Sequence, residues 1–486
     1  MSHCLDGIFG FQGCETALLD QLQKAPLAPF TVDGQSGFQA VIPFSYDSRG
    51  AMFRLFDSIS GVWKVLFRNK GEKHARVAIG ALAGYPNMPA VDCEEDLRVY
   101  GGIPFDEAAE IAPYWREFRR RFFFLPTLEF RFGLESSLSV RVLGDDKAKA
   151  HFSLRENLFT LLCRMQAPEA RVQLHFEGMI KEPSEKVWQG SVLAAKNAIL
   201  RDDFSKVVLS RTALMRVPEK VTSGQLMAAL EGRDGGQDKQ KGQKQQNEQN
   251  EQNEKSYLFG FESPTGLSFL GCSPERVLSW QEGFAYVDAI AGTRKRCQDQ
   301  REDERQSRTL KGSQKDGLEH RSVTDFVAAT LEDYCDAYEV LEAQAVLKLK
   351  HVQHMITRYK GRLKPSCSPY DLLESLHPTP AVAGMPKKAA LDYLREKESP
   401  QRGWFSGSVG WVSSFGGDFA IAIRSGLLDR SLLRVFAGAG IVEGSQAEEE
   451  WLETLAKMRN FTDLFHSEKP PAYPPTHKSD DRSITL

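Results

Sequence analysis

The sequence has little of what marks a secreted, membrane-spanning or cysteine-bound metal protein. Its 486 residues include eight cysteines, and no two of these form a C-x-x-C pair, which argues against a zinc module or a redox motif. Nowhere do about eighteen apolar residues follow one another, and the N-terminus lacks a basic segment followed by a long apolar block. The 62 Lys and Arg nearly balance the 65 Asp and Glu, so charge gives no argument for nucleic acid or an acidic membrane. We therefore expect a cytoplasmic protein with free thiols that binds neither nucleic acid nor membrane.

Composition changes sharply at two places. Residues 235–254, GGQDKQKGQKQQNEQNEQNE, contain no apolar side chain, and residues 467–486 are rich in Pro, Ser and charged residues. Such segments cannot offset the entropy lost on ordering, so we expect a low-complexity insertion and a disordered tail. Over the whole sequence, 41% hydrophobic residues are enough for a substantial core.

Two regions differ in their patterning. Residues 1–185 mix short apolar runs such as GFQAVIPF and GVWKVLF with turn residues, which predicts a mostly strand-containing part. Residues 186–466 contain groups of predicted strands separated by amphipathic helical patterns. Single strands and single helices do not follow one another in regular turn. This arrangement favours an α+β fold of layered, largely antiparallel β-sheets with flanking and intervening helices over a doubly wound sheet.

Lys206 stands directly before the apolar run Val207, Val208 and Leu209, which is typical of a buried strand. A lysine at the mouth of a strand usually keeps its ammonium in water while its stem covers apolar surface. The alternative is a lysine held in a cleft, where it could act as a base. The residues alone leave both interpretations open.

Acidic residues on the last predicted helix raise a similar choice. Glu450, Glu453 and Lys457 follow the spacing i, i+3 and i+7, so they lie on one helical face. Two carboxylates on one face could hold Mg²⁺, which prefers oxygen ligands, or the face could simply be solvated.

Three further features bear on a possible site. Glu319 stands where a helix is predicted to begin, so it could serve only the helix dipole. Arg424 follows the apolar run FAIAI and could bind a carboxylate or merely end a strand. The segment GAGIVEG is no dinucleotide fingerprint, because Glu443 occupies the place of the third glycine.

Nine motifs occur in a fixed order between about residues 186 and 465: KVVLSR, GCSPERVL, AIAGTRKR, KDGLEH, LHPTPAVAGMP, FSGSVGW, AIRSG, FAGAGIVEGS and EEEWLETLAK. Together they resemble the chorismate-utilising enzymes, and isochorismate synthases in particular. The resemblance implies a chorismate-binding fold of the anthranilate synthase component I type. It also implies Mg²⁺-dependent conversion of chorismate to isochorismate, by water addition at C2 and loss of the C4 hydroxyl.

Residue roles follow from the same resemblance. Lys206 is expected to be the general base that activates water, and Glu275 the general acid that protonates the departing hydroxyl. The predicted metal ligands are Glu319, Glu450 and Glu453, and the predicted substrate-binding residues are Gly292, Thr293, His377, Arg424, Gly438, Gly440 and Lys457. These roles suit a dianionic substrate, because one base and one acid handle the two hydroxyl groups while cations offset the charge.

Members of the family differ in their nucleophile. Enzymes that use ammonia typically carry Gln at the position of Lys206, and aminodeoxychorismate synthases often carry Lys at the position of Ala291; this chain has neither. Salicylate synthases, which also eliminate pyruvate from isochorismate, share Lys206 and are the alternative. A catalytically silent chorismate-binding member is a third hypothesis. Phe405 replaces the Tyr of many relatives, a difference whose consequence the sequence does not give.

Partners and pathway are predicted only broadly. Chorismate is the expected small-molecule substrate, and no glutamine amidotransferase subunit is expected. The sequence is compatible with a monomer or a homodimer, and with menaquinone or siderophore biosynthesis.

Overall fold

The computed structural model describes all residues except 1–7, 10–13, 47, 49, 73, 167–171, 177, 233–255, 399–400 and 466–486. The predicted insertion at 235–254 and the predicted tail at 467–486 lie outside the described residues.

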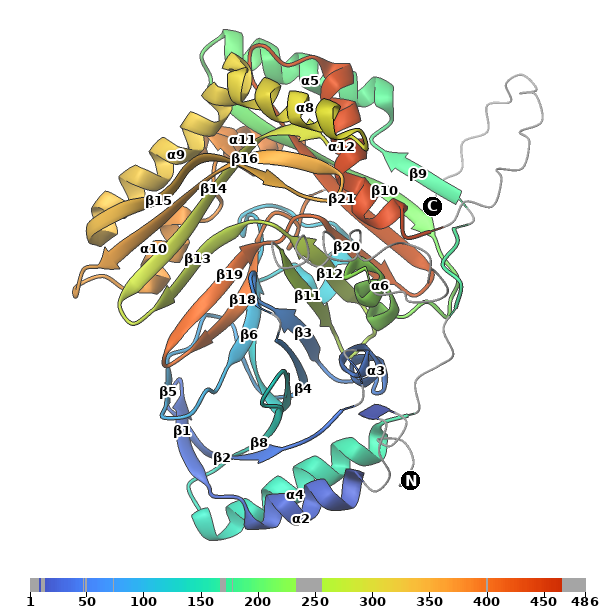
Figure 1. Cartoon of the computed structure of the whole chain (residues 1–486), viewed down its shortest axis with the longest axis vertical. Coiled ribbons are helices and arrows are strands. Elements are labelled where there is room, and N and C mark those ends of the chain that lie inside the picture. The colour runs from blue at the N-terminus through green and yellow to red at the C-terminus, as the bar shows by residue number, and fades with distance from the viewer. Residues whose placement is uncertain are drawn as a thin grey trace.

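Strands of the described part join into one hydrogen-bonded network in which every recorded pairing is antiparallel (Figure 1). They are β1 (Ala28–Val32), β2 (Gln35–Pro43), β3 (Lys64–Arg68), β4 (Ala75–Tyr85), β5 (Val91–Cys93), β6 (Val99–Ile103), β7 (Phe122–Phe132), β8 (Ser137–Leu143), β9 (Gly178–Glu182), β10 (Lys206–Arg216), β11 (Tyr257–Glu262), β12 (Ser268–Ser273), β13 (Arg276–Gln281), β14 (Phe284–Lys295), β15 (Cys335–Lys348), β16 (Val352–Leu363), β17 (Gly384–Met385), β18 (Ser408–Ser413), β19 (Gly416–Ile421), β20 (Ser425–Asp429) and β21 (Leu432–Ile441).

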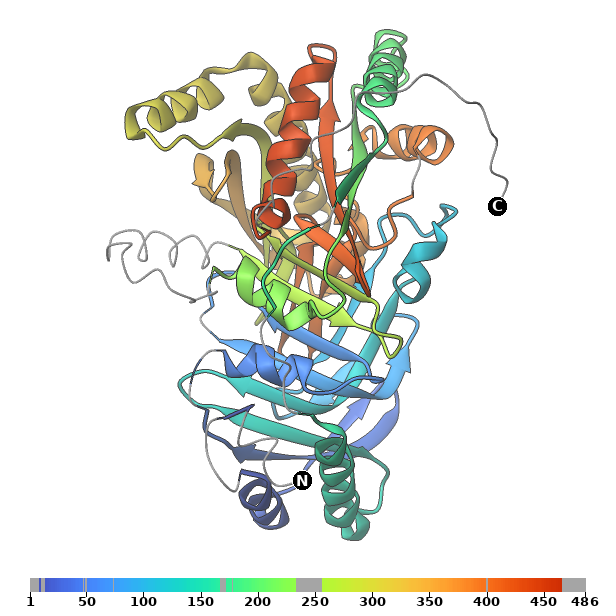
Figure 2. The ribbon, with the colours of Figure 1, turned by 90° about the vertical axis from the view of Figure 1, so that its right-hand side faces the viewer.

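Helices lie at both ends of this network. They are α2 (Cys14–Lys24), α3 (Ala51–Asp57), the 3₁₀ turn η1 (Pro113–Phe118), α4 (Lys147–Arg164), α5 (Glu185–Leu200), α6 (Ser223–Leu230), α8 (Gln300–Gly312), α9 (Gln314–Tyr334), α10 (Pro369–Leu376), α11 (Lys387–Lys397) and α12 (Ala447–Thr462). Helices α5, α8, α9, α11 and α12 cover one end, and α2 and α4 lie beside β2 and β8 at the other (Figures 1 and 2). The predicted α+β fold is confirmed. No helix in the described ranges has both the length and the apolar composition needed to cross a membrane.

Strands from the first 185 residues pair directly with later ones. β3 pairs with β11, β6 with β18, and β9 with β10. The predicted boundary near residue 185 therefore does not separate two hydrogen-bonded sheets, and the division into two regions stays a prediction from patterning.

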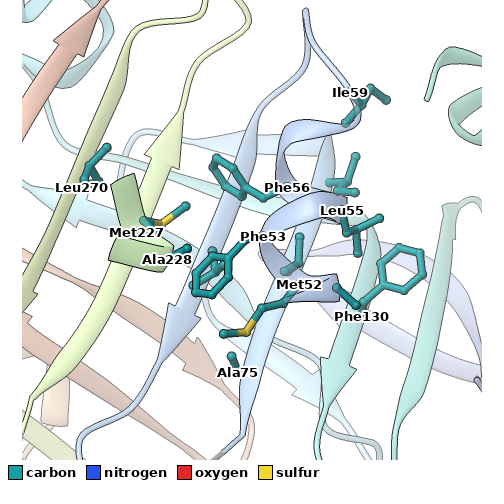
Figure 3. Close-up of a cluster of buried hydrophobic side chains, with 14 of the residues drawn as sticks. Met52, Phe53, Leu55, Phe56, Ile59, Ala75, Phe130, Met227, Ala228 and Leu270 are labelled. Carbon is teal, nitrogen blue, oxygen red and sulfur yellow. The ribbon is translucent and has the colours of Figure 1, made fainter. Parts of the chain in front are cut away.

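Helix α3, from the first 185 residues, packs against elements of the later region (Figure 3). Five of its seven residues are buried, because it is apolar on most sides and packs among sheet and helix neighbours. Its last residue, Asp57, accepts hydrogen bonds from Thr222 Oγ1 (2.6 Å) and the Gly224 amide (2.8 Å) at the start of α6. Thr222 and Gln225 complete a capping box, which satisfies the free amides of that helix end.

Candidate active site

Lys206 is the first residue of β10, opposite Met385 of β17. Val207, Val208 and Leu209 are buried, as the apolar run predicts. Lys206 itself is 2% exposed, which excludes the interpretation of a solvated lysine at a strand mouth. The strand thus places the Lys206 ammonium in the interior of the protein.

The Lys206 ammonium faces a carboxylate. Its Nζ lies 3.0 Å from Glu319 Oε1, in an ion pair that lacks the alignment of a hydrogen bond. Gly440 lies beside this pair, and a Cβ there would lie 2.6 Å from Glu319 Oε1 and 3.0 Å from Lys206 Cε. Only glycine leaves room for the pair at this point.

Glu319 does not begin its helix, contrary to the prediction. Helix α9 begins at Gln314, because the Ser313 side chain caps it by accepting from the Asp316 amide at 3.2 Å. Glu319 therefore lies in the second turn, so service to the helix dipole does not explain it. Burial raises the pKa of Glu319, but the charge of Lys206 and of further lysines outweighs burial and holds that pKa below its usual value.

Glu275 lies between β12 and β13 and is 2% exposed. Its Oε1 has no hydrogen-bond partner among the described residues. Burial, reinforced by the negative charge of Asp288, raises the pKa of Glu275 to about 8, although Lys70 and Lys206 oppose the rise. The carboxyl group is therefore protonated near neutral pH, the state that a general acid requires.

The three predicted metal ligands each contact a lysine. Glu319 pairs with Lys206, Glu450 Oε1 lies 2.6 Å from Lys315 Nζ, and Glu453 Oε1 lies 2.7 Å from Lys457 Nζ. In the described part of the chain, no three His, Cys, Asp or Glu side chains are arranged to hold a metal together.

The chemistry of these carboxylates nevertheless fits a cation. Burial and the nearby charge of Glu453 raise the pKa of Glu450 to about 7, despite its bond with Lys315. Carboxylates that repel one another in a buried place are stabilised by a shared positive charge, and oxygen donors suit Mg²⁺. The residues present are thus compatible with the metal that the resemblance implies.

Arg424 supplies a buried positive charge to the site. It is 4% exposed, and its Nη2 donates to His354 Nε2 at 2.9 Å. His354 in turn donates through Nδ1 to the Gly292 carbonyl (3.0 Å), so the ring is neutral and holds the guanidinium in place. Burial and the charges of Arg424 and Lys457 lower the pKa of His354 well below its usual value, which agrees with a neutral ring.

Two residues of the site have strained backbone conformations. Arg424 has φ 52° and Ser406 has φ 61°, values that residues with a side chain rarely adopt. Gly292, at φ 74°, forms a bulge between Ala291 and Thr293 where β14 pairs with β16. A bulge redirects the next side chain, and Thr293 Oγ1 lies 3.2 Å from His354 Nδ1.

Most of these groups line one pocket, which encloses about 680 Å³, part of it open to solvent; Lys206, Glu450 and Glu453 are not in its lining. The predicted site residues in its lining are Glu275, Gly292, Thr293, Glu319, Arg424, Gly438, Gly440 and Lys457. Phe405 is also in the lining, stacked on Phe436 with ring centroids 5.1 Å apart. Lys206 adjoins the pocket through Glu319, and Lys457 donates to the Gly438 carbonyl at 2.9 Å.

His377 is not in this lining. Its ring lies 2.9 Å from the Pro104 carbonyl through Nε2 and 2.8 Å from Ser408 Oγ through Nδ1. Both nitrogens are thus occupied by protein groups, and the geometry gives no support to the predicted substrate contact.

Sequence reasoning missed His354 and Lys315. His354 lies between Gln353 and Met355 in a β16 segment of mixed polarity, so no sequence pattern set it apart. Lys315 stands four residues before Glu319, so a helix drawn from Ser313 would have placed both on one face.

Known proteins resemble the chain over most of its length. Residues 86–466 match the family described as chorismate binding enzyme. The chain is 32% identical over 366 residues to isochorismate synthase MenF of Bacillus subtilis, covering 74% of this chain and 73% of the relative. It is 31% identical over 369 residues to the salicylate biosynthesis isochorismate synthase of Pseudomonas aeruginosa, covering 74% and 72%.

Solved structures share the fold. MenF, the menaquinone-specific isochorismate synthase from Escherichia coli, has a TM-score of 0.74 at 22% identity, covering 93% of this chain and 99% of that one. Anthranilate synthase component I from Streptococcus pneumoniae has a TM-score of 0.60 at 21% identity, covering 82% and 92%. With the family match spanning most of the sequence, the chain belongs to the chorismate binding enzymes.

Proposed function

We propose that the protein is an isochorismate synthase, an isomerase that converts chorismate to isochorismate. The observation that carries this proposal is a buried carboxyl in the pocket lining, Glu275, that is protonated near neutral pH, with the buried Lys206 adjoining the same pocket through Glu319. A water-for-hydroxyl exchange needs both a proton acceptor and a proton donor. The names of the relatives from Bacillus subtilis and Pseudomonas aeruginosa support the same activity.

The proton transfers assign the two central residues. Lys206 takes a proton from water while the water oxygen bonds to C2, a role that requires the ammonium paired with Glu319 to release a proton to solvent first. Glu275 gives its proton to the C4 hydroxyl, which leaves as water when the C4–oxygen bond breaks. The unpartnered Oε1 of Glu275 is available for this transfer, because no described group occupies it.

The remaining residues bind and orient the dianion. Arg424 and Lys457 place two positive charges on the pocket, and Arg424 has no carboxylate partner among the described residues. A buried arginine without an ion pair is well suited to a substrate carboxylate, because its fork can donate two parallel hydrogen bonds. Thr293 and the glycines at 438 and 440 allow a ligand close to the backbone.

Glu319, Glu450 and Glu453 are proposed to hold Mg²⁺. When bound, the ion would neutralise a substrate carboxylate and steady the charge that moves during the substitution. The described carboxylates fit this task by their donor chemistry and by the high pKa of Glu450.

Incubation of the purified protein with chorismate, Mg²⁺ and ¹⁸O-labelled water tests the proposal. We expect isochorismate that carries the label at the C2 hydroxyl, in equilibrium with chorismate, and no product in the presence of EDTA. Stoichiometric pyruvate with an aromatic product would instead identify a salicylate synthase. Chorismate recovered without label would support a silent member of the family. Cytoplasmic location, oligomeric state, lack of an amidotransferase subunit and the menaquinone or siderophore pathway stay predictions.

A further inference from the structure

Three lysines neutralise the three predicted metal carboxylates, but only two of these lysines belong to the substrate site. Lys457 lines the pocket, and Lys206 adjoins it as the proposed base. Lys315 is absent from the pocket lining and has no role in the proposed proton transfers. Its bond with Glu450 therefore needs another explanation.

The charge of Lys315 is unfavourably placed on its own helix. It lies in the first turn of α9, where the helix dipole disfavours a positive charge. Glu450 lies in the first turn of α12, where a negative charge is favoured, so Lys315 compensates an acid of the facing helix.

Lys315 contacts the most buried of the three carboxylates. Its Nζ lies 2.6 Å from Glu450 Oε1, whereas Glu319 and Glu453 pair with Lys206 and Lys457. The Lys315 ammonium thus occupies the position beside Glu450 that a divalent cation would take. Its side chain is 30% exposed, whereas Glu450 is 2% exposed, so Lys315 can swing into water while Glu450 stays inside.

We propose that Lys315 is a built-in counter-ion of the metal site, which a divalent cation must displace from Glu450 on binding. This inference rests on the metal role assigned under the proposed function. Lys315 then has two effects: it stabilises the acidic cluster without metal, and it weakens metal binding by competing for Glu450. A bond between two charged groups is worth about 1.5 to 3 kcal/mol, so its removal should tighten metal binding about tenfold or more.

The test compares Lys315→Met with Lys348→Met in the full-length, metal-free protein at pH 8. Lys348 is a matched control, because its Nζ lies 2.6 Å from Glu304 Oε1 and its side chain is 29% exposed, away from the pocket. Mg²⁺ affinity is measured by calorimetry and Mn²⁺ affinity by electron paramagnetic resonance, both without chorismate. Thermal unfolding is followed with and without Mg²⁺.

We expect Lys315→Met to bind both metals about tenfold more tightly or better, and to melt at a lower temperature than wild type only when metal is absent. Lys348→Met should keep the wild-type affinity, and Lys315→Arg should keep it approximately because the charge is retained. If Lys315→Met does not fold, Lys315→Gln gives the same comparison with a neutral side chain.

Unchanged or weaker metal binding in the neutral variants would overturn the inference, since Lys315 would then not compete with metal. Absence of metal binding in every protein would also overturn it. Neither readout uses turnover, so a protein that binds metal as expected but does not convert chorismate would refute the proposed function while leaving the counter-ion role intact.

Discussion

Glu275→Gln tests the proposed acid through stability as well as activity. Glutamine has almost the shape of a protonated glutamic acid but cannot ionise. The pKa of Glu275 rises from 4.5 to about 8 on folding. Between these values the folded protein holds a proton that the unfolded chain has released, so wild-type stability must fall as pH rises from 4.5 to about 8.

The magnitude follows from the size of this rise. For each pH unit in this window, the free energy of unfolding of the wild-type protein falls by about 1.4 kcal/mol. The total loss is at most about 3 kcal/mol at pH 7 and about 5 kcal/mol above pH 8. Glu275→Gln lacks this penalty. For a chain of 486 residues about 1 kcal/mol corresponds to about 1 °C in melting temperature, so the variant should melt about 3 °C higher at pH 7.

Activity should move in the opposite direction. Loss of a positioned general acid lowers kcat about 10²- to 10⁴-fold. Wild-type kcat itself should decline above about pH 8, where Glu275 ionises. Calorimetric melting from pH 5 to pH 9 and product formation from chorismate measure the two effects on the same preparations.

Glu129→Gln provides a control of opposite sign. Glu129 is 1% exposed; burial alone would raise its pKa, but Arg141 and Arg76 hold it below its usual value. Its stabilisation is present at neutral pH and lost as pH falls, so Glu129→Gln should melt lower than wild type at pH 7. If instead Glu275→Gln and wild type keep a constant difference in melting temperature from pH 5 to pH 8, Glu275 is not held protonated and the reasoning is refuted.

Four other predictions concern the site and the insertion. Lys206→Ala should lower water addition at C2 about 10²- to 10⁴-fold while Mg²⁺-dependent chorismate binding, followed by calorimetry, persists; full activity would exclude it as the base. Glu319→Gln and Glu450→Gln should each shift the Mg²⁺ dependence of turnover to higher concentration with an unchanged circular dichroism spectrum, and identical titration curves would make both carboxylates structural. His354→Leu should raise KM more than it lowers kcat, because the guanidinium loses its anchor; an unchanged KM would contradict this. Deletion of 237–253 should leave melting temperature and turnover nearly unchanged, since the segment has no apolar side chain, whereas loss of either would show that it packs.

Much of the fold could be predicted because its signals are local. The apolar run after Lys206 gave a buried strand, and the acidic pattern at the end of the chain gave α12 with Glu453 and Lys457 in contact at 2.7 Å. The order of motifs identified Glu275 and Arg424, both of which line the pocket.

What could not be predicted depends on contacts between distant elements. His354 meets Thr293 only because β14 and β16 pair with a bulge between Ala291 and Thr293. The positive φ of Arg424 has no sequence signal, because the residue is not glycine. His377 is a related case: a motif implied a substrate contact, whereas in the structure its ring lies between two protein oxygens, so the substrate contact stays a prediction.

The pairing of early strands with late ones bears on how the chain is made. β6 leaves the ribosome early, but its partner β18 is synthesised only in the last fifth of the chain. Contacts between residues so far apart in sequence form slowly. Until β18 is synthesised, the unpaired edge of β6 can pair with strands of other chains. We therefore expect the nascent protein to need protection by chaperones until the segment with β18 has emerged. For the same reason, the motif-bearing region produced alone should aggregate, because β11, β10 and β18 would each lack a neighbouring strand.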